Sequence, residues 1–118
     1  MSRGFRDLIV WQRAMDFAFF VYKIADNLPA KEKFGLWSQI TRAAISIPAN
    51  IAEGYVKSSR KDFCRFLQIS LGSSAEVETY IELMIKLGYI SSTEYEKSIS
   101  MNDEVRRMLR SFIQKTKE

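Results

Sequence analysis

The chain has 118 residues, of which 47% are hydrophobic and 27% charged, so it can form one ordinary core and is not intrinsically disordered. It contains no histidine, which excludes the commonest general base, the commonest metal ligand and every Ser-His or Cys-His arrangement. The formal net charge of +4 is a mild bias toward an anionic partner.

The first predicted helix runs from about Asp7 to Asn27 and is ended by Pro29. Two neighbouring apolar seams repeat along it at spacings of three and four, which is typical of a bundle helix that packs on two others. Phe19 and Phe20 lie outside the cleaner seams. They are either ordinary surface aromatics or part of a contact between subunits.

The second predicted helix runs from about Lys33 to Tyr55, and a line of polar residues follows one side of it. This polar line, spaced 3, 4, 4 and 3 residues apart, consists of Gln39, Arg42, Ser46, Asn50 and Glu53. Because small and aliphatic residues flank it, we expect the line to be buried against other helices, a second subunit or a ligand. Pro48 predicts a kink and frees the carbonyl of Ala44, which then needs another donor.

The third predicted helix runs from about Arg60 to Leu87, with Ser58 or Ser59 as its N-cap. The middle of its core seam is small, and Gly72 nearby predicts that another helix crosses closely there. Glu76 and Glu78 are the candidate acceptors for Arg42. We interpret the polar line with these two carboxylates as a buried network that fixes helix register; the alternative is a ligand or subunit surface.

The fourth predicted helix runs from about Thr93 to Lys115. Ser91, Ser92 or Thr93 can cap it, with Glu94 or Glu96 placed for a capping box. Four helices with short connections predict an all-α, antiparallel up-down-up-down four-helix bundle, in a single domain over residues 1–118.

Two clusters of basic residues can contact phosphates. The first consists of Lys57, Arg60, Lys61 and Arg65. The second, in the tail, consists of Arg106, Arg107, Arg110, Lys115 and Lys117, and its Arg106 and Arg110 are one helical turn apart. The first cluster together with Arg106 and Arg110 supplies the six candidates for nucleic-acid binding. Taken alone, each cluster is equally consistent with a solvated helix face, and neither is interleaved with aromatics as in stacking platforms.

Catalysis is not expected. No glycine-rich phosphate loop is present, and we expect no cofactor, no metal and no small-molecule substrate. An all-carboxylate metal cluster of Glu53, Glu76, Glu78 and Glu82 is a minor alternative. No signal peptide or membrane span is expected, and the single Cys64 fits a reducing cytoplasm.

Several motifs resemble one family across nearly the whole chain. They are the runs at 8–14 (LIVWQRA), 35–43 (GLWSQITRA), 46–54 (SIPANIAEG) and 66–79 (FLQISLGSSAEVET). They are similar to the four-helix-bundle proteins encoded in intervening sequences of bacterial 23S rRNA. The resemblance implies a ring-like homo-oligomer, expected to be a pentamer. A related branch contains accessory proteins of diversity-generating retroelements, which bind nucleic acid and a reverse transcriptase.

The leading functional hypothesis is a non-enzymatic homo-oligomer that binds RNA or DNA through backbone charge. The alternative is a protein-interaction or scaffold module that does not bind nucleic acid and recognises a partner chain through its polar line and surface aromatics.

Overall fold

The computed structural model describes residues 1–117, which form four long helices. They are α1 (Ile9–Ala25), α2 (Leu36–Tyr55), α3 (Arg60–Lys86) and α4 (Ser92–Lys117). Two short 3-10 helices, η1 (Gly4–Asp7) and η2 (Ala30–Glu32), precede α1 and α2. The described residues contain no strand, so the predicted all-α class is confirmed.

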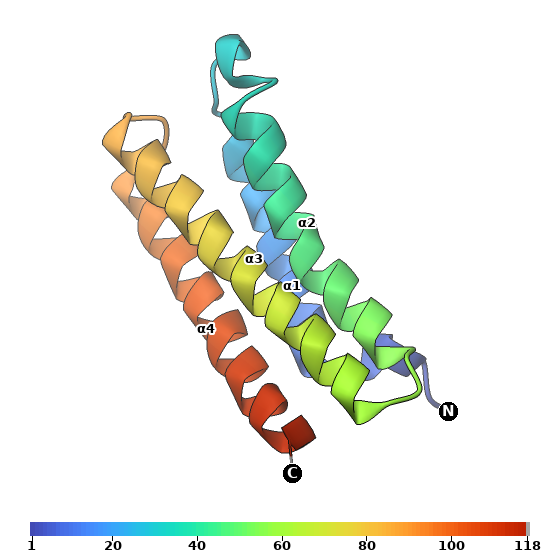
Figure 1. The fold of residues 1–118 in the computed structure, drawn as a ribbon. Coiled ribbons are helices and arrows are strands. Elements are labelled where there is room, and N and C mark those ends of the chain that lie inside the picture. The colour runs from blue at the N-terminus through green and yellow to red at the C-terminus, as the bar shows by residue number, and fades with distance from the viewer. Residues whose placement is uncertain (118) are drawn as a thin grey trace.

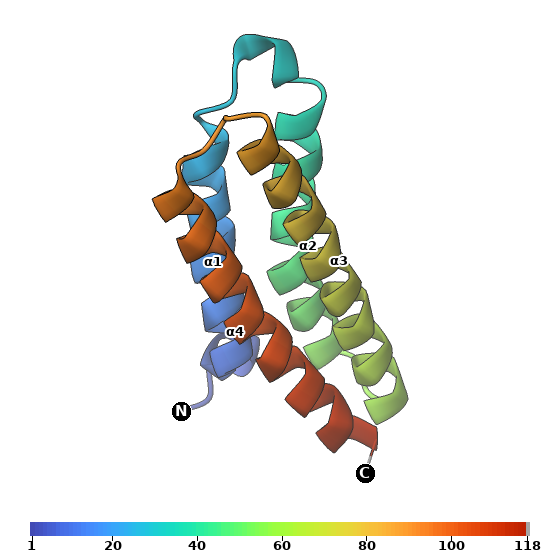
Figure 2. The same cartoon turned by 90° about the vertical axis from the view of Figure 1, so that its left-hand side faces the viewer.

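Successive helices run in opposite directions (Figures 1 and 2). Ser46 of α2 bonds to Ser73 of α3, and Gln39 of α2 bonds to Tyr80 of α3. Residue numbers therefore fall along α3 as they rise along α2, as in an antiparallel pair. The N-terminus, the connection from α2 to α3 and the C-terminal end all lie together at the lower end of Figure 1. The predicted up-down-up-down bundle is therefore correct.

The core draws on every helix. Phe17 of α1, Ile47 of α2, Leu67 of α3 and Leu109 of α4 are all completely buried. Burial of such side chains stabilises the fold by roughly 1.5–3 kcal/mol each. No helix within residues 1–117 combines the length and apolarity needed to cross a membrane.

Two helices approach closely at Gly54, where the last turn of α2 lies against the start of α3. A Cβ added there would lie 2.7 Å from the Cβ of Phe66 and 3.0 Å from the ring of Phe63. The prediction of a close crossing at Gly72 is wrong, because Gly72 is exposed and a Cβ there would meet nothing within 4 Å. Small residues do line the α2–α3 contact, but they are Ser70, Ser73 and Gly54.

The helix ends follow the sequence. Ser59 caps α3 by accepting a hydrogen bond from the backbone N–H of Asp62 at 3.0 Å. Ser91 and Glu94 form a reciprocal capping box at the start of α4, with bonds of 3.1 and 2.9 Å. Both caps were within the predicted sets, and each satisfies amide groups that the first turn of a helix leaves without a partner.

Helix α2 continues through Pro48 without interruption. A side chain does donate to a backbone carbonyl near the proline, but the acceptor is not the carbonyl of Ala44 that was predicted to need a donor. The hydroxyl of Ser70 donates to the carbonyl of Ile47 at 2.8 Å, and this bond ties α3 to the backbone of α2 beside the proline.

Candidate nucleic-acid interface

The fold concentrates positive charge at one end of the bundle. We call the residues 1–10, 53–66 and 106–117 the basic end; they hold eleven Lys or Arg and three Asp or Glu. The other described residues hold seven basic and ten acidic side chains. Figure 1 shows why these segments meet: both chain ends and the α2–α3 connection lie at the same end of the molecule. The small net positive charge of the chain is therefore distributed unevenly, with a large positive excess at one end of the bundle.

Lys57 and Arg65 are held by an aromatic ring. The Lys57 ammonium lies 5.5 Å and the Arg65 guanidinium 4.5 Å from the centre of the Phe66 ring. Phe66 is buried, and its Cβ lies against Gly54 near the end of α2, so contact with α2 restricts its position. Cation–π contact orients both cations without neutralising them. Arg65 also lies 3.9 Å from Asp62, a long and exposed ion pair that contributes little.

The two basic clusters that the sequence shows separately meet across α3 and α4. Lys61 and Arg65, at the start of α3, line an open hollow of about 450 Å³ together with Lys117 near the end of α4. The remaining lining residues are Cys64, Gln68 and Thr116. Lys61 and Lys117 form no ion pair within residues 1–117, so their charge is available to an anion. Arg60 begins α3 and is exposed.

Arg106 is not a free phosphate ligand. Its side chain is 21% exposed, donates to Glu78 at 2.5 Å and lies 3.6 Å from Asp103. Arg110, one turn later, has no ion pair in the described chain and lines a second hollow of about 390 Å³ beside Glu78 and Glu82. Of the two candidate arginines in the tail, Arg110 alone keeps an unneutralised charge.

Arg3 and Arg6 belong to the basic end and were missed by sequence reasoning. Arg3 bonds to Asp7 through its backbone N–H at 2.9 Å and its side chain at 3.3 Å, while Arg6 lies 5.1 Å from the ring centre of Phe5. They are far from both basic clusters in sequence. Only the packing of η1 against the end of α2 brings them there.

The polar line is not buried against other helices of the chain, which was one of the three predicted partners. Gln39, Arg42 and Glu53 are exposed, and only Ser46 and Asn50 are partly buried. Helix α2 has neighbours on two sides, α1 and α3, and the third side faces outward, so a sector flanked by small residues need not be covered. The Asn50 amide donates to Ser46, and Ser46 shares a hydrogen bond with Ser73 of α3 at 2.9 Å.

The predicted pairing of Arg42 with Glu76 or Glu78 is also wrong. Glu78 lies on the side of α3 that faces α4 and binds Arg106. Glu76 accepts a hydrogen bond from Tyr80 at 2.8 Å, and this bond to the carboxylate raises the pKa of the tyrosine above its ordinary value. Arg42 makes no hydrogen bond or ion pair within residues 1–117.

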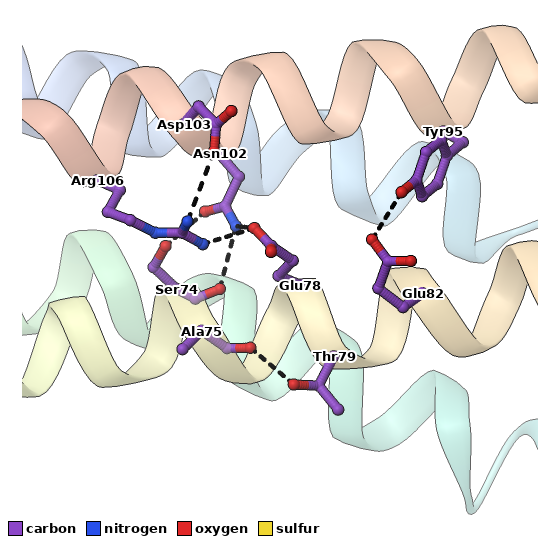
Figure 3. A network of polar contacts seen from close by, with 9 residues as sticks. All are labelled: Ser74, Ala75, Glu78, Thr79, Glu82, Tyr95, Asn102, Asp103 and Arg106. Atoms are coloured by element: carbon purple, nitrogen blue, oxygen red, sulfur yellow. Dashed lines mark hydrogen bonds and ion pairs between the residues drawn. The ribbon is translucent and has the colours of Figure 1, made fainter.

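A buried polar network does exist, between α3 and α4 (Figure 3). Asn102 is completely buried, accepts a hydrogen bond from the Ser74 hydroxyl at 2.6 Å and donates to the Ser74 carbonyl at 3.1 Å. The same amide donates to Glu78 at 3.3 Å, which connects it to Arg106. Farther along, Tyr95 donates to Glu82 at 2.7 Å, which raises the pKa of Tyr95. Every buried side-chain nitrogen and oxygen in the described chain has a partner.

The predicted inner face of the last helix contained apolar residues and did not include Asn102. The signal was present: Asn102 stands three residues before Val105 and seven before Leu109, at core spacing. A lone asparagine at such a position commonly sets helix register. The network is therefore structural.

No group of three Cys, Asp or Glu within residues 1–117 is arranged to hold a metal ion.

Comparison with known proteins identifies close resemblances. Residues 6–111 match the family model described as 23S rRNA-intervening sequence protein. A crystal structure from Bacteroides thetaiotaomicron, described as a protein of unknown function from the S23 ribosomal protein family, superposes with a TM-score of 0.83. It is 33% identical, and the match covers 90% of this chain and 96% of that one. No curated protein matches the chain.

Proposed function

Since this chain belongs to the family of 23S rRNA-intervening sequence proteins, we propose that it is a non-enzymatic, homo-oligomeric bundle that binds RNA or DNA through the basic end. The observation that supports this most is the excess of eleven basic over three acidic side chains in segments that the fold gathers at one end. Charge of this kind binds the phosphate backbone without reading sequence.

The available cations come from three different segments. Lys57 follows α2, Lys61 lies in the first turn of α3, and Arg110 and Lys117 are in the last turns of α4. A phosphate backbone that crosses the end of the bundle can contact all three segments at once, whereas one that follows a single helix cannot. We propose that binding is end-on and takes place in the cytoplasm.

Self-association is part of the proposal. Met15, Phe19 and Tyr22 repeat at four and three residues on the outside of α1, and Ile45 lies on the outside of α2. Phe19 is 65% and Ile45 50% exposed. The ring of Tyr22 meets Trp37 of α2 edge-on at 6.3 Å, so these side chains border the α1–α2 face. Exposed apolar residues in one region are typical of a subunit contact. Phe20, by contrast, packs on the core under Lys97.

A ring of copies would repeat the basic end around one axis and strengthen a weak contact through multivalency. The family resemblance points to five copies. Light scattering at micromolar concentration should then give five times the chain mass of 13.7 kDa. A monomer at that concentration would refute the oligomeric part of the proposal.

The second candidate function is a protein-interaction module. The exposed apolar side chains of α1 and α2 favour it, because they fit a partner chain as well as a second copy. Binding of labelled structured RNA and duplex DNA, measured by fluorescence anisotropy from low to high salt, separates the two. The proposal predicts affinity that falls steeply with salt. No binding at low salt, or binding indifferent to salt, would leave the interaction module as the better account.

A further inference from the structure

A hollow lies inside the basic end, between the start of α1 and the last turns of α4. Its volume is about 550 Å³, within the range of ligand sites in proteins. Residues at the start of α1 and just before it line one side of the hollow, and the last turns of α4 line the other.

The floor of the hollow is apolar and partly aromatic. Leu8, Met108 and Phe112 line it and are only partly buried, although each packs against the core. Phe112 contacts Phe63 edge-on at a centroid distance of 5.2 Å, which holds its ring in place. Ile9 also lines the hollow and is 52% exposed. A flat apolar group that entered would cover side chains that are otherwise left to water.

The rim is charged and mostly positive. Arg107 and Lys115 line the hollow and make no ion pair within residues 1–117. The one acidic group is Asp7, whose pKa is lowered, first by a hydrogen bond from the backbone N–H of Arg3 and then by the Arg3 side chain. Asp7 therefore stays ionised and can accept hydrogen bonds, and Ser111 adds a hydroxyl.

We propose that this hollow receives an unpaired base of a single-stranded nucleic acid, while Arg107 and Lys115 hold the adjoining phosphates. A nucleobase combines a flat face suited to Phe112 and Met108 with N–H donors, such as the N3–H of thymine, whose hydrogen bonds Asp7 and Ser111 can accept. Its own backbone supplies the anions that the rim requires. The inference rests on the proposed function, and it narrows the partner from nucleic acid in general to a strand with accessible bases.

The test separates base binding from phosphate binding. A labelled twelve-residue oligothymidylate and an abasic strand of the same length carry the same phosphates, so only base contacts distinguish them. At fixed low salt, we expect the protein to bind the oligothymidylate about tenfold or more tightly than the abasic strand. Equal affinity for the two would overturn the hollow as a base site and leave the proposed function standing. Absence of binding to both would overturn the base site, and the salt series with structured RNA and duplex DNA would then decide the proposed function.

Filling the hollow gives a second, independent readout. Ser111→Phe places a ring in it without changing charge, and Ser100→Phe makes the same change at an exposed position on α4 outside the hollow. We expect S111F to reduce the preference for the oligothymidylate to nearly one and S100F to keep it, with unchanged circular dichroism spectra. If S111F does not fold, the affinities of the wild-type protein for the oligothymidylate and the abasic strand decide the question without it. A fluorescent fatty acid gives the opposing outcome. If it binds the wild type but not S111F, while S111F still prefers the oligothymidylate to the abasic strand, the hollow binds an apolar carboxylate and the proposal is overturned.

Discussion

The side chain of Asn102 holds both polar groups of Ser74, accepting from its hydroxyl at 2.6 Å and donating to its carbonyl at 3.1 Å. Both residues are completely buried, one on α4 and one on α3. A shift of α4 by one turn would break both bonds and leave an amide unpaired in the core. The pair therefore sets the position of α4 along α3, and it places Lys117 opposite the start of α3 and Arg110 beside Glu78 and Glu82.

Replacing Asn102 with alanine should lower the free energy of unfolding by about 2–3 kcal/mol, because it empties a buried volume and removes the partner of the Ser74 hydroxyl. Urea unfolding measures the change. Ser100→Ala, on the exposed side of the same helix, should stay within about 0.5 kcal/mol of the wild type. If N102A were as stable as S100A, the Asn102–Ser74 contact would have no role in fixing the bundle.

Two glycines should respond in opposite directions to the same substitution. Gly54→Ala should destabilise by about 1–3 kcal/mol, because the new methyl group would lie 2.7 Å from the Cβ of Phe66. Gly72→Ala should stabilise by about 0.5–1 kcal/mol, because the site is open and alanine favours helix. Thermal unfolding of the two variants checks both signs. A stabilised G54A would show that α2 and α3 are not in close contact there.

Substitution of two arginines should distinguish a structural arginine from one on the surface. Arg106→Ala should destabilise by about 1–2 kcal/mol, since it leaves the partly buried Glu78 carboxylate without its strongest partner. Arg42→Ala should change stability by less than about 0.5 kcal/mol, because Arg42 is exposed. Chemical denaturation in parallel gives the comparison. A larger loss in R42A than in R106A would restore the polar line as the principal network.

The capping box should make stability depend on pH. The pKa of Glu94 lies below its ordinary value of 4.5, mainly because the backbone N–H of Ser91 donates to it, and Asn27 also donates to it at 2.9 Å. The unfolded chain then binds the proton more readily than the native chain, so this contribution is full above about pH 4.5 and is lost as pH falls through the lowered native value.

Denaturant unfolding between pH 7 and pH 3 tests this effect. Glu94→Gln should remove part of the acid-dependent loss and be less stable than the wild type at neutral pH. Glu96→Gln is the matched control, because Glu96 is exposed and makes no hydrogen bond or ion pair within residues 1–117. Identical pH profiles for E94Q and the wild type would show that the cap contributes nothing through its charge.

The four helices could be predicted because the sequence signals that mark them are local. Apolar spacing, Pro29 and the caps at Ser59 and Ser91 each depend on residues within a few positions of one another. The partners of the polar groups could not be predicted in the same way. Whether Glu78 meets Arg42 or Arg106 depends on which side of α3 each neighbour occupies, and a difference of two residues between Glu76 and Glu78 reverses that side.

The basic end illustrates the same limit. Its two clusters were visible in the sequence, but their meeting across α3 and α4, the addition of Arg3 and Arg6, and the hollow beside Phe112 follow from packing alone. Gly72 is the clearest error: a glycine in a long helix suggested a close neighbour, and no part of the described chain approaches it.

The most direct test of the central claim is to neutralise one end of the bundle at a time. Lys61→Gln, Arg110→Gln and Lys117→Gln together remove three charges from the basic end; Lys31→Gln, Lys33→Gln and Lys86→Gln remove three from outside it. The slope of log affinity for a single-stranded RNA against log salt should become shallower by up to about 2 in the first variant, since each lost phosphate contact removes about 0.7. The second should keep nearly the wild-type slope. Equal losses in the two variants would show that net charge alone governs binding, and would contradict a nucleic-acid site at the basic end.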